Sequence, residues 1–199
     1  MYQKIGFCLQ QAGDVTGALE YYENAELLNA DSLWALRRIA ACHKMLGHTE
    51  KALEYYSRIS AKNPEDMNAV MNIGHCLMES GRPDEAMKQY YKVEFMDEKS
   101  DRAWRPLAWC AFLRHDYATS SKYYNRLEER GVLTDNDYLN MGHLAMAQGK
   151  YRDAIKEYRR YTDAGHDFEE LRGALTDDRS DMIAGGVNAD MIPLLLDNM

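Results

Sequence analysis

Apolar side chains recur along this chain with one fixed period. A branched or long aliphatic side chain returns every 34 residues, at Ile5, Ile39, Ile73, Leu107 and Met141, and a tyrosine returns with the same step at Tyr22, Tyr56, Tyr90, Tyr124 and Tyr158. Inside a period the apolar positions lie three or four residues apart, as in Leu36, Ile39, Ala40 and His43, which is the spacing of one face of an α-helix. The pattern predicts two amphipathic helices in each period.

Small residues and glycines follow the same period. The small positions are Gly6, Ala40, Gly74, Ala108 and Gly142, with a second set at Ala18, Ala52, Ala86, Ser120 and Ala154; the turn positions are Gly13, Gly47, Gly81, His115 and Gly149. Small side chains let two helices approach closely, and a glycine ends the first helix. One such hairpin cannot bury its apolar side alone, so we expect successive hairpins to stack.

These columns resemble the tetratricopeptide repeat, in which W-x2-L-G-x2-Y is followed by A-x3-F and a closing proline. Trp104-x2-Leu107, Ala52-x3-Tyr56 and Pro64 fit this motif, and the sequence style is similar to that of uncharacterised bacterial repeat proteins. The resemblance implies an all-α, right-handed superhelical solenoid. Its repeats would span about residues 1–32, 33–66, 67–100, 101–134 and 135–166, making one five-repeat region over 1–166.

The fourth repeat departs from the pattern. His115 stands at the turn glycine and Ser120 at the alanine, so we expect this hairpin to be looser than the others. Pro106 removes a backbone donor and should bend the helix or make it start near Trp104.

Residues 167–199 leave the period. We expect one or two short helices up to Gly185-Gly186 and a last one over 190–197, with Pro193 in its first turn. The favoured interpretation is a helical cap over the last repeat. The alternative is an apolar tail that docks on a partner or on another copy.

The charge and the cysteine content restrict the partners and the compartment that the chain could have. The formal net charge of -8 argues against nucleic acid or a membrane surface as the main partner, and no apolar run is long enough to span a bilayer. Cys8, Cys42, Cys76 and Cys110 form one more 34-residue column. They should therefore be too far apart for disulfides and should be mostly buried thiols, which favours a reducing cytoplasm.

The chain shows no apparatus for catalysis. It contains no H-E-x-x-H, G-x-x-x-x-G-K-[ST], G-x-S-x-G or G-x-G-x-x-G sequence, and its histidines are scattered. The cysteine spacing does not suit a metal site. We predict a non-enzymatic protein without metal or cofactor.

A partner should bind the side of the first helices that points away from the packing side. In tetratricopeptide repeat arrays this side lines a concave groove, and the resemblance implies the same here. The candidate groove residues are Trp34, Arg37, Arg38, Asn68, Met71, Asn72, His75, Arg102, Arg105, Trp109, Asn136, Asn140 and His143.

The groove candidates include no acid although the chain is acidic overall. Arginine and asparagine bind carboxylates and peptide amides, and tryptophan is a common interface anchor. We expect an extended or helical peptide of acidic character. The alternative is that the arginines pair with acids on neighbouring turns and that Trp109 fills space beside Pro106.

Some family members hold C-terminal carboxylates of chaperones in a clamp of five polar residues. By resemblance, Arg37, Asn72 and Arg102 match three clamp positions, whereas Ala41 and Pro106 break the other two. The sequence therefore predicts a scaffold or adaptor that binds a protein or peptide other than a chaperone tail. The alternative function is a regulatory or oligomerisation segment of a larger protein, and self-association through the array ends is a further possibility.

Overall fold

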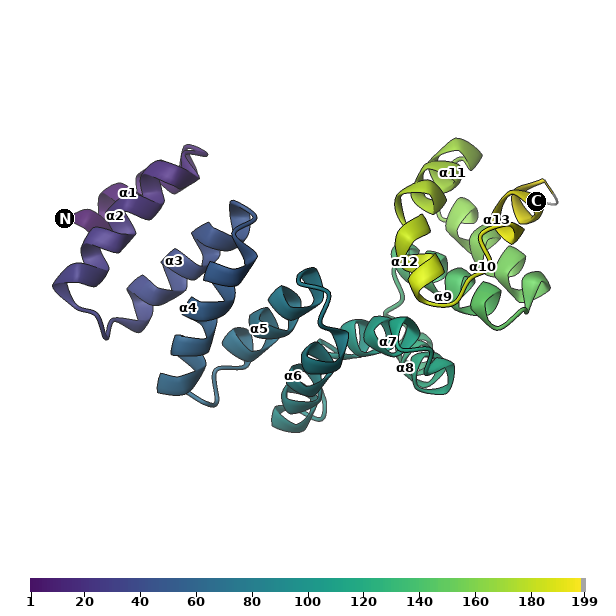
Figure 1. Cartoon of the computed structure of the whole chain (residues 1–199), viewed down its shortest axis with the longest axis horizontal. Coiled ribbons are helices and arrows are strands. Elements are labelled where there is room, and N and C mark those ends of the chain that lie inside the picture. The colour runs from purple at the N-terminus through teal and green to yellow at the C-terminus, as the bar shows by residue number, and fades with distance from the viewer. Residues whose placement is uncertain (198–199) are drawn as a thin grey trace. The chain divides into compact units, whose positions relative to one another are not determined.

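The computed structural model describes residues 1–197 as helices and short connections; the last two residues of the predicted 167–199 cap lie outside this description. The chain divides into two compact units, unit 1 over Met1–Glu98 and unit 2 from Lys99 onward. Unit 1 holds three helix pairs, visible from purple to teal in Figure 1: α1 (Tyr2–Gln11), α2 (Val15–Leu28), α3 (Leu33–Met45), α4 (Thr49–Lys62), α5 (Met67–Glu79) and α6 (Pro83–Met96).

Unit 2 holds two further pairs and the C-terminal segment. Its helices are α7 (Trp104–Leu113), α8 (Tyr117–Glu129), α9 (Asp135–Ala147), α10 (Tyr151–Asp163), α11 (Phe168–Asp177), α12 (Arg179–Ala184) and α13 (Met191–Leu196). The prediction of short helices up to the Gly185-Gly186 pair and of a last helix with Pro193 in its first turn is confirmed. Among residues 1–197, no helix combines the length and apolar character needed to cross a bilayer.

Polar caps explain where many of the helices begin. A side-chain oxygen accepts a hydrogen bond from the third helical backbone N–H at Asp14, Ser32, Asp66 and Asp116. Thr134 with Asp137, and Asp167 with Glu170, form reciprocal capping boxes. Each cap satisfies donors that have no partner inside the helix.

The predicted turn column reverses the chain inside each hairpin. Gly13, Gly47, Gly81 and Gly149 have φ between 68° and 85°, and His115 takes the same left-handed conformation at 60°. The residue after each turn position donates its backbone N–H to the carbonyl five residues earlier, as His48 does to His43. This hydrogen bond is typical of a Schellman motif at the end of a helix. The expectation that the fourth hairpin is looser is wrong, because α7 and α8 pack as closely as the other pairs once His115 adopts this conformation.

The small-residue column marks where the two helices of a hairpin touch. A Cβ atom built on Gly74 would lie 2.5 Å from the ring of Tyr90, and one on Gly142 would lie 2.3 Å from the ring of Tyr158. The tyrosine rings occupy the space that a side chain would need. This confirms that bulk at this column would separate the helices.

Candidate functional site

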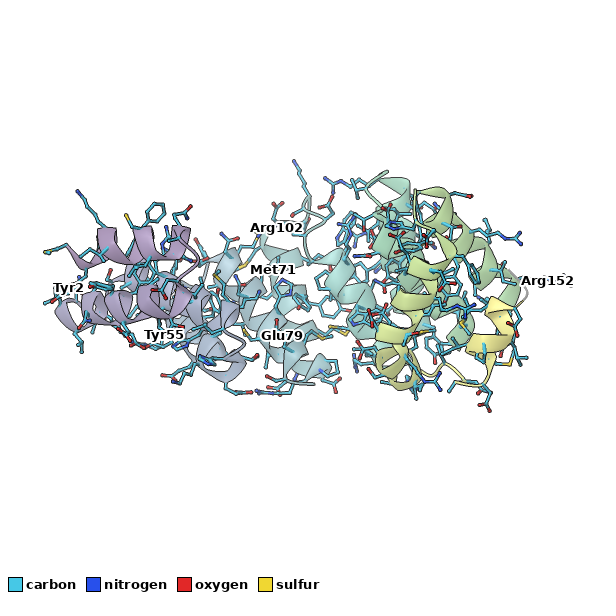
Figure 2. The ribbon with its side chains drawn as sticks, turned by 90° about the horizontal axis from the view of Figure 1, so that it is seen from above. Tyr2, Tyr55, Met71, Glu79, Arg102 and Arg152 are labelled. Atoms are coloured by element: carbon cyan, nitrogen blue, oxygen red, sulfur yellow. The ribbon has the colours of Figure 1, made fainter. Side chains whose placement is uncertain are left out.

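The groove candidates of unit 1 lie on α3 and α5, which are the first helices of the second and third hairpins. We call this surface the unit 1 face, defined by Trp34, Arg37, Arg38, Asn68, Asn72 and His75. Met71, the remaining candidate of this unit, is only 7% exposed and belongs to the core. Figure 2 labels Met71 on α5, together with Glu79 at the C-terminal end of the same helix. A buried methionine gives a partner little surface to contact.

Arg37 on the unit 1 face is held by the carboxylate that caps α5, the first helix of the next hairpin. Its Nη2 lies 2.6 Å from Oδ2 of Asp66, and its side chain remains 49% exposed against 8% for Asp66. Asp66 also accepts the Ala69 N–H at 3.0 Å as the N-cap of α5. Burial opposes the charge on Asp66, but the hydrogen bonds from Arg37 and Ala69 together hold its pKa below the ordinary value. The alternative that arginines pair with neighbouring acids therefore applies to Arg37.

Arg38 and Trp34 form a stack that reaches the first hairpin. The Arg38 guanidinium lies 5.6 Å from the Trp34 ring centre and 5.7 Å from that of Phe7. Trp34 in turn meets Tyr22 edge to face at 5.4 Å between ring centres. Phe7 was not among the predicted residues, although it occupies the same 34-residue column as His75 and is 44% exposed.

Asparagines and a lysine line the middle of the unit 1 face. Lys44 donates to Oδ1 of Asn72 at 3.0 Å, and Asn72 donates to the Asn68 carbonyl at 2.8 Å. A hollow of about 180 Å³ lies between the second and third hairpins, lined by Arg37, Tyr56, Ile59, Asp66, Asn68, Ala69 and Asn72. Sequence reasoning missed Lys44, although Lys44 lies seven residues after Arg37 on the same side of α3 and the helical spacing could have found it.

His75 closes this face with a fixed ring orientation. Its Nδ1 lies 3.0 Å from the Tyr90 hydroxyl, with ring centres 5.6 Å apart and ring planes at 58°. Tyr90 itself is fully buried. The hydroxyl of a core tyrosine thus anchors a half-buried histidine at the surface.

Unit 2 carries the other candidates on α7 and α9, and we call Arg105, Trp109, Asn136, Asn140 and His143 the unit 2 face. Arg105 contacts both oxygens of Asp137 and donates to the Val132 carbonyl. Asn136 is exposed, and Asn140 shares a side-chain hydrogen bond with Tyr124.

Two candidates of the fourth repeat serve other roles than the helix pattern predicted. Arg102 lies in the turn before α7, because the helix starts at Trp104, as expected from Pro106 in its first turn. Trp109 packs on Phe112 and His143, with ring centres 5.0 Å and 6.4 Å apart. These contacts favour the alternative that Trp109 fills space, here beside Phe112 and His143.

The C-terminal segment folds back onto the unit 2 face. His143 is fully buried; its Nδ1 lies 2.9 Å from the Tyr158 hydroxyl and its Nε2 lies 3.2 Å from Oδ2 of Asp178, between α11 and α12. Further along, the Ala184 and Gly185 carbonyls accept hydrogen bonds from His115 and Tyr117. Asp178 therefore covers the His143 end of this face, and Ala184 and Gly185 hold the segment against the start of α8 and the turn before it.

The cysteine column is buried in three of its four positions. Cys42, Cys76 and Cys110 are buried, whereas Cys8 on α1 is exposed. Burial raises the pKa of the Cys42 and Cys76 thiols, which makes them poor nucleophiles. Within residues 1–197 no three His, Cys, Asp or Glu side chains group as metal ligands would.

Comparison with solved structures gives similar folds at low sequence identity. TTC0263, a thermophilic protein of Thermus thermophilus, matches with a TM-score of 0.63 and 16% identity over 88% of this chain and 96% of its own. YrrB, described as having an unusual peptide-binding site, matches at 0.72 and 14%, over 88% and 90%. PilW, a type IV pilus biogenesis factor, matches at 0.72 and 16%, over 92% and 88%.

Comparison with curated protein sequences gives no match. Two models of the family described as tetratricopeptide repeat do match the sequence. One covers residues 9–71 and 45–110, and the other covers 139–175. The helix pairs, the 34-residue columns and these matches together show that the chain belongs to the tetratricopeptide repeat family.

Proposed function

We propose that this chain is a non-catalytic adaptor that binds a peptide segment of a partner protein on the unit 1 face. Tetratricopeptide repeat proteins generally act as protein-interaction scaffolds, and they bind protein or peptide partners. The single observation that carries the choice of face is that Asp178 of the C-terminal segment already occupies His143 on the unit 2 face. A partner would have to displace this segment there, whereas the unit 1 face presents Arg37, Arg38 and Asn68 to solvent.

The charge on the unit 1 face supports a partner of acidic character. Arg38 and Lys44 add positive charge beside the Arg37–Asp66 pair, in a chain of net charge -8. The negative net charge of the chain repels other acidic proteins and lowers the rate at which they encounter it. The positive charges of the unit 1 face act only at short range, so they favour an acidic peptide segment whose carboxylates come into direct contact with them.

A paired capture experiment tests this proposal. The wild-type chain, a face variant with Arg38→Glu and Lys44→Glu, and an outer variant with Lys51→Glu and Lys88→Glu are used as baits in lysate of the source organism. Both variants carry the same change in charge, and Lys51 and Lys88 are exposed on α4 and α6. We expect a protein that the wild type and the outer variant retain and the face variant loses. Equal retention by all three baits would contradict the proposal.

A second candidate function is association through the N-terminal hairpin. Cys8 is exposed although the cysteines of its column in the next three hairpins are buried, and Tyr2 is 38% exposed although Leu36 in its column is fully buried. These side chains would be covered if another helix packed on α1.

Analytical ultracentrifugation of the wild type and of Tyr2→Glu across a hundredfold concentration range tests this association. A dimer that only the wild type forms supports it, and monomers at every concentration rule it out.

A further inference from the structure

Residues 178–187 carry the pattern of a helix bound in a groove, and we call them the C-terminal latch. Along α11 and α12 the covered positions follow one another at steps of four and three residues: Leu171, Leu175, Asp178, Met182 and Gly185. Asp178 is half-buried, the other four are buried, and most positions between them are exposed. This is the spacing of one helix face, and helical peptides bind grooves through anchors at such a spacing.

The fourth hairpin holds the C-terminal end of α12. The Nε2 atom of His115 lies 2.7 Å from the Ala184 carbonyl oxygen, and the Tyr117 hydroxyl donates to the Gly185 carbonyl at 3.0 Å. Carbonyls at the end of a helix have no partner inside it, so these side chains satisfy two of them. A Cβ atom built on Gly185 would overlap the ring of Phe112. A glycine is therefore needed for this close approach.

The other end of the latch meets α9. Oδ2 of Asp178 lies 3.2 Å from Nε2 of His143, and Met182, between the two ends, is fully buried. The latch thus has a polar contact at each end and a buried apolar anchor between them. We call the surface that receives it the latch site, defined by Phe112, His115, Tyr117 and His143.

Two residues of the latch site break the repeat pattern. His115 replaces the turn glycine, and among residues 1–197 it is the one residue other than glycine with a positive φ, a conformation that a side chain disfavours. Phe112 is the one aromatic residue of its 34-residue column, whose other members are Gln10, Lys44, Met78 and Met146. The other hairpins fold without a histidine or an aromatic ring at these places. The contacts with the latch give a reason for both residues.

The latch is short enough to open while the repeats stay folded. Helix α12 has six residues, fewer than the about 12–15 that an isolated helix needs to be stable. Two glycines follow it, and Ile183 on its outer side is 46% exposed. Segments with few buried side chains open at a lower free energy than the core of a protein.

We propose that the latch site is a receptor for a short helix, that the latch is its built-in ligand, and that a partner helix with Asp, Met and Gly at the spacing of Asp178, Met182 and Gly185 replaces it. This inference goes beyond the proposed function, because it concerns unit 2 and a second kind of partner. Tethering gives the latch an effective concentration of about a millimolar, so the site stays closed until a helix that binds more tightly competes for it.

A fluorescent peptide of residues 176–188 tests this exchange on the full chain. The unlatched chain carries Asp178→Lys and Met182→Ser, which remove the side-chain contacts of the latch and keep the latch site. We expect fluorescence anisotropy to show at least about tenfold tighter binding to the unlatched chain than to the wild type, where the tethered latch competes. A peptide with the same two substitutions should bind neither chain. Adding His115→Gly to the unlatched chain should weaken binding of the native peptide.

Equal affinity of the native peptide for the two chains would overturn the proposal. So would the absence of binding to an unlatched chain that melts at the temperature of the wild type. If the unlatched chain melts early, amide hydrogen exchange of residues 179–187 in single variants decides the question.

Tyr117→Phe is the variant for this exchange measurement, because it removes only the hydroxyl that holds the Gly185 carbonyl. Tyr151→Phe is its matched control, since Tyr151 occupies the same column one period later and is 36% exposed. Exchange of the latch should become about fivefold faster in Tyr117→Phe, the factor for one hydrogen bond of about 1 kcal/mol, and stay unchanged in Tyr151→Phe. The same exchange in both variants would overturn the proposal.

Discussion

Gly142 shows how one absent side chain sets the distance between two helices. The Tyr158 ring lies where its Cβ would be, and Tyr158 is itself fully buried. The sequence predicted a small residue at this column from its period alone. Alanine stands in the same column at Ala40 and Ala108, so the sequence did not predict that position 142 needs glycine, which depends on how far the Tyr158 ring reaches across this hairpin.

We expect Gly142→Ala to lower the free energy of unfolding by about 1–3 kcal/mol, the usual cost of overpacking a well-packed core. Gly173→Ala is the matched control: it lies in α11, and a Cβ there would meet no atom within 4 Å. It should raise the free energy of unfolding by about 0.5–1 kcal/mol, because alanine is the better helix former. Urea denaturation of both variants measures this, and a neutral Gly142→Ala would show that the hairpin tolerates the methyl group.

His43 makes stability depend on pH. Burial, followed by the charges of Lys51 and His48, lowers the pKa of its imidazole. The unfolded chain then takes up a proton below about pH 6.5 that the folded chain does not, so stability is complete above this pH and falls as the pH is lowered. Leu77 occupies the same column one period later, so His43→Leu should fit and should flatten the change in melting temperature between pH 7.5 and 5. An unchanged slope would mean that His43 is not responsible.

At the scale of elements, Asp66 connects the second and third hairpins. It caps α5 and binds Arg37 of α3. The sequence predicted Arg37 on the exposed side of its helix and left open whether it would pair with an acid. The pairing depends on how the connection from α4 to α5 turns, and periodicity carries no information about that.

Asp66→Asn tests the ion pair separately from the cap, since asparagine also caps helices well. With Arg37 half exposed, we expect a loss of about 1 kcal/mol at pH 7. The pKa of Asp66 lies below its ordinary value, so its stabilisation is present above about pH 4 and is lost as the pH falls through the lowered pKa. Wild type and variant should therefore converge in stability in acid. A constant difference down to pH 2 would assign the loss to the cap instead.

For the whole molecule, the 34-residue period predicted the family and the helix pairs, but it did not show which faces are covered. The C-terminal segment lies outside the period, and its contacts through Asp178, Ala184 and Gly185 depend on tertiary folding. Thirteen groove candidates that looked equivalent in sequence therefore differ in the structure: Met71 and His143 are buried, whereas Arg38 and Asn68 reach solvent to different degrees.

The most direct test is amide hydrogen exchange of the full chain, measured alone and with the partner that the paired capture retains. Exchange reports local opening and protection for each segment. If the partner binds the unit 1 face, it should slow exchange in α3 and α5 and leave exchange unchanged in the segment from Asp178 to Gly185. Protection confined to α7 and α9, with faster exchange in that segment as it is displaced, would contradict binding at the unit 1 face and place the binding site on the unit 2 face.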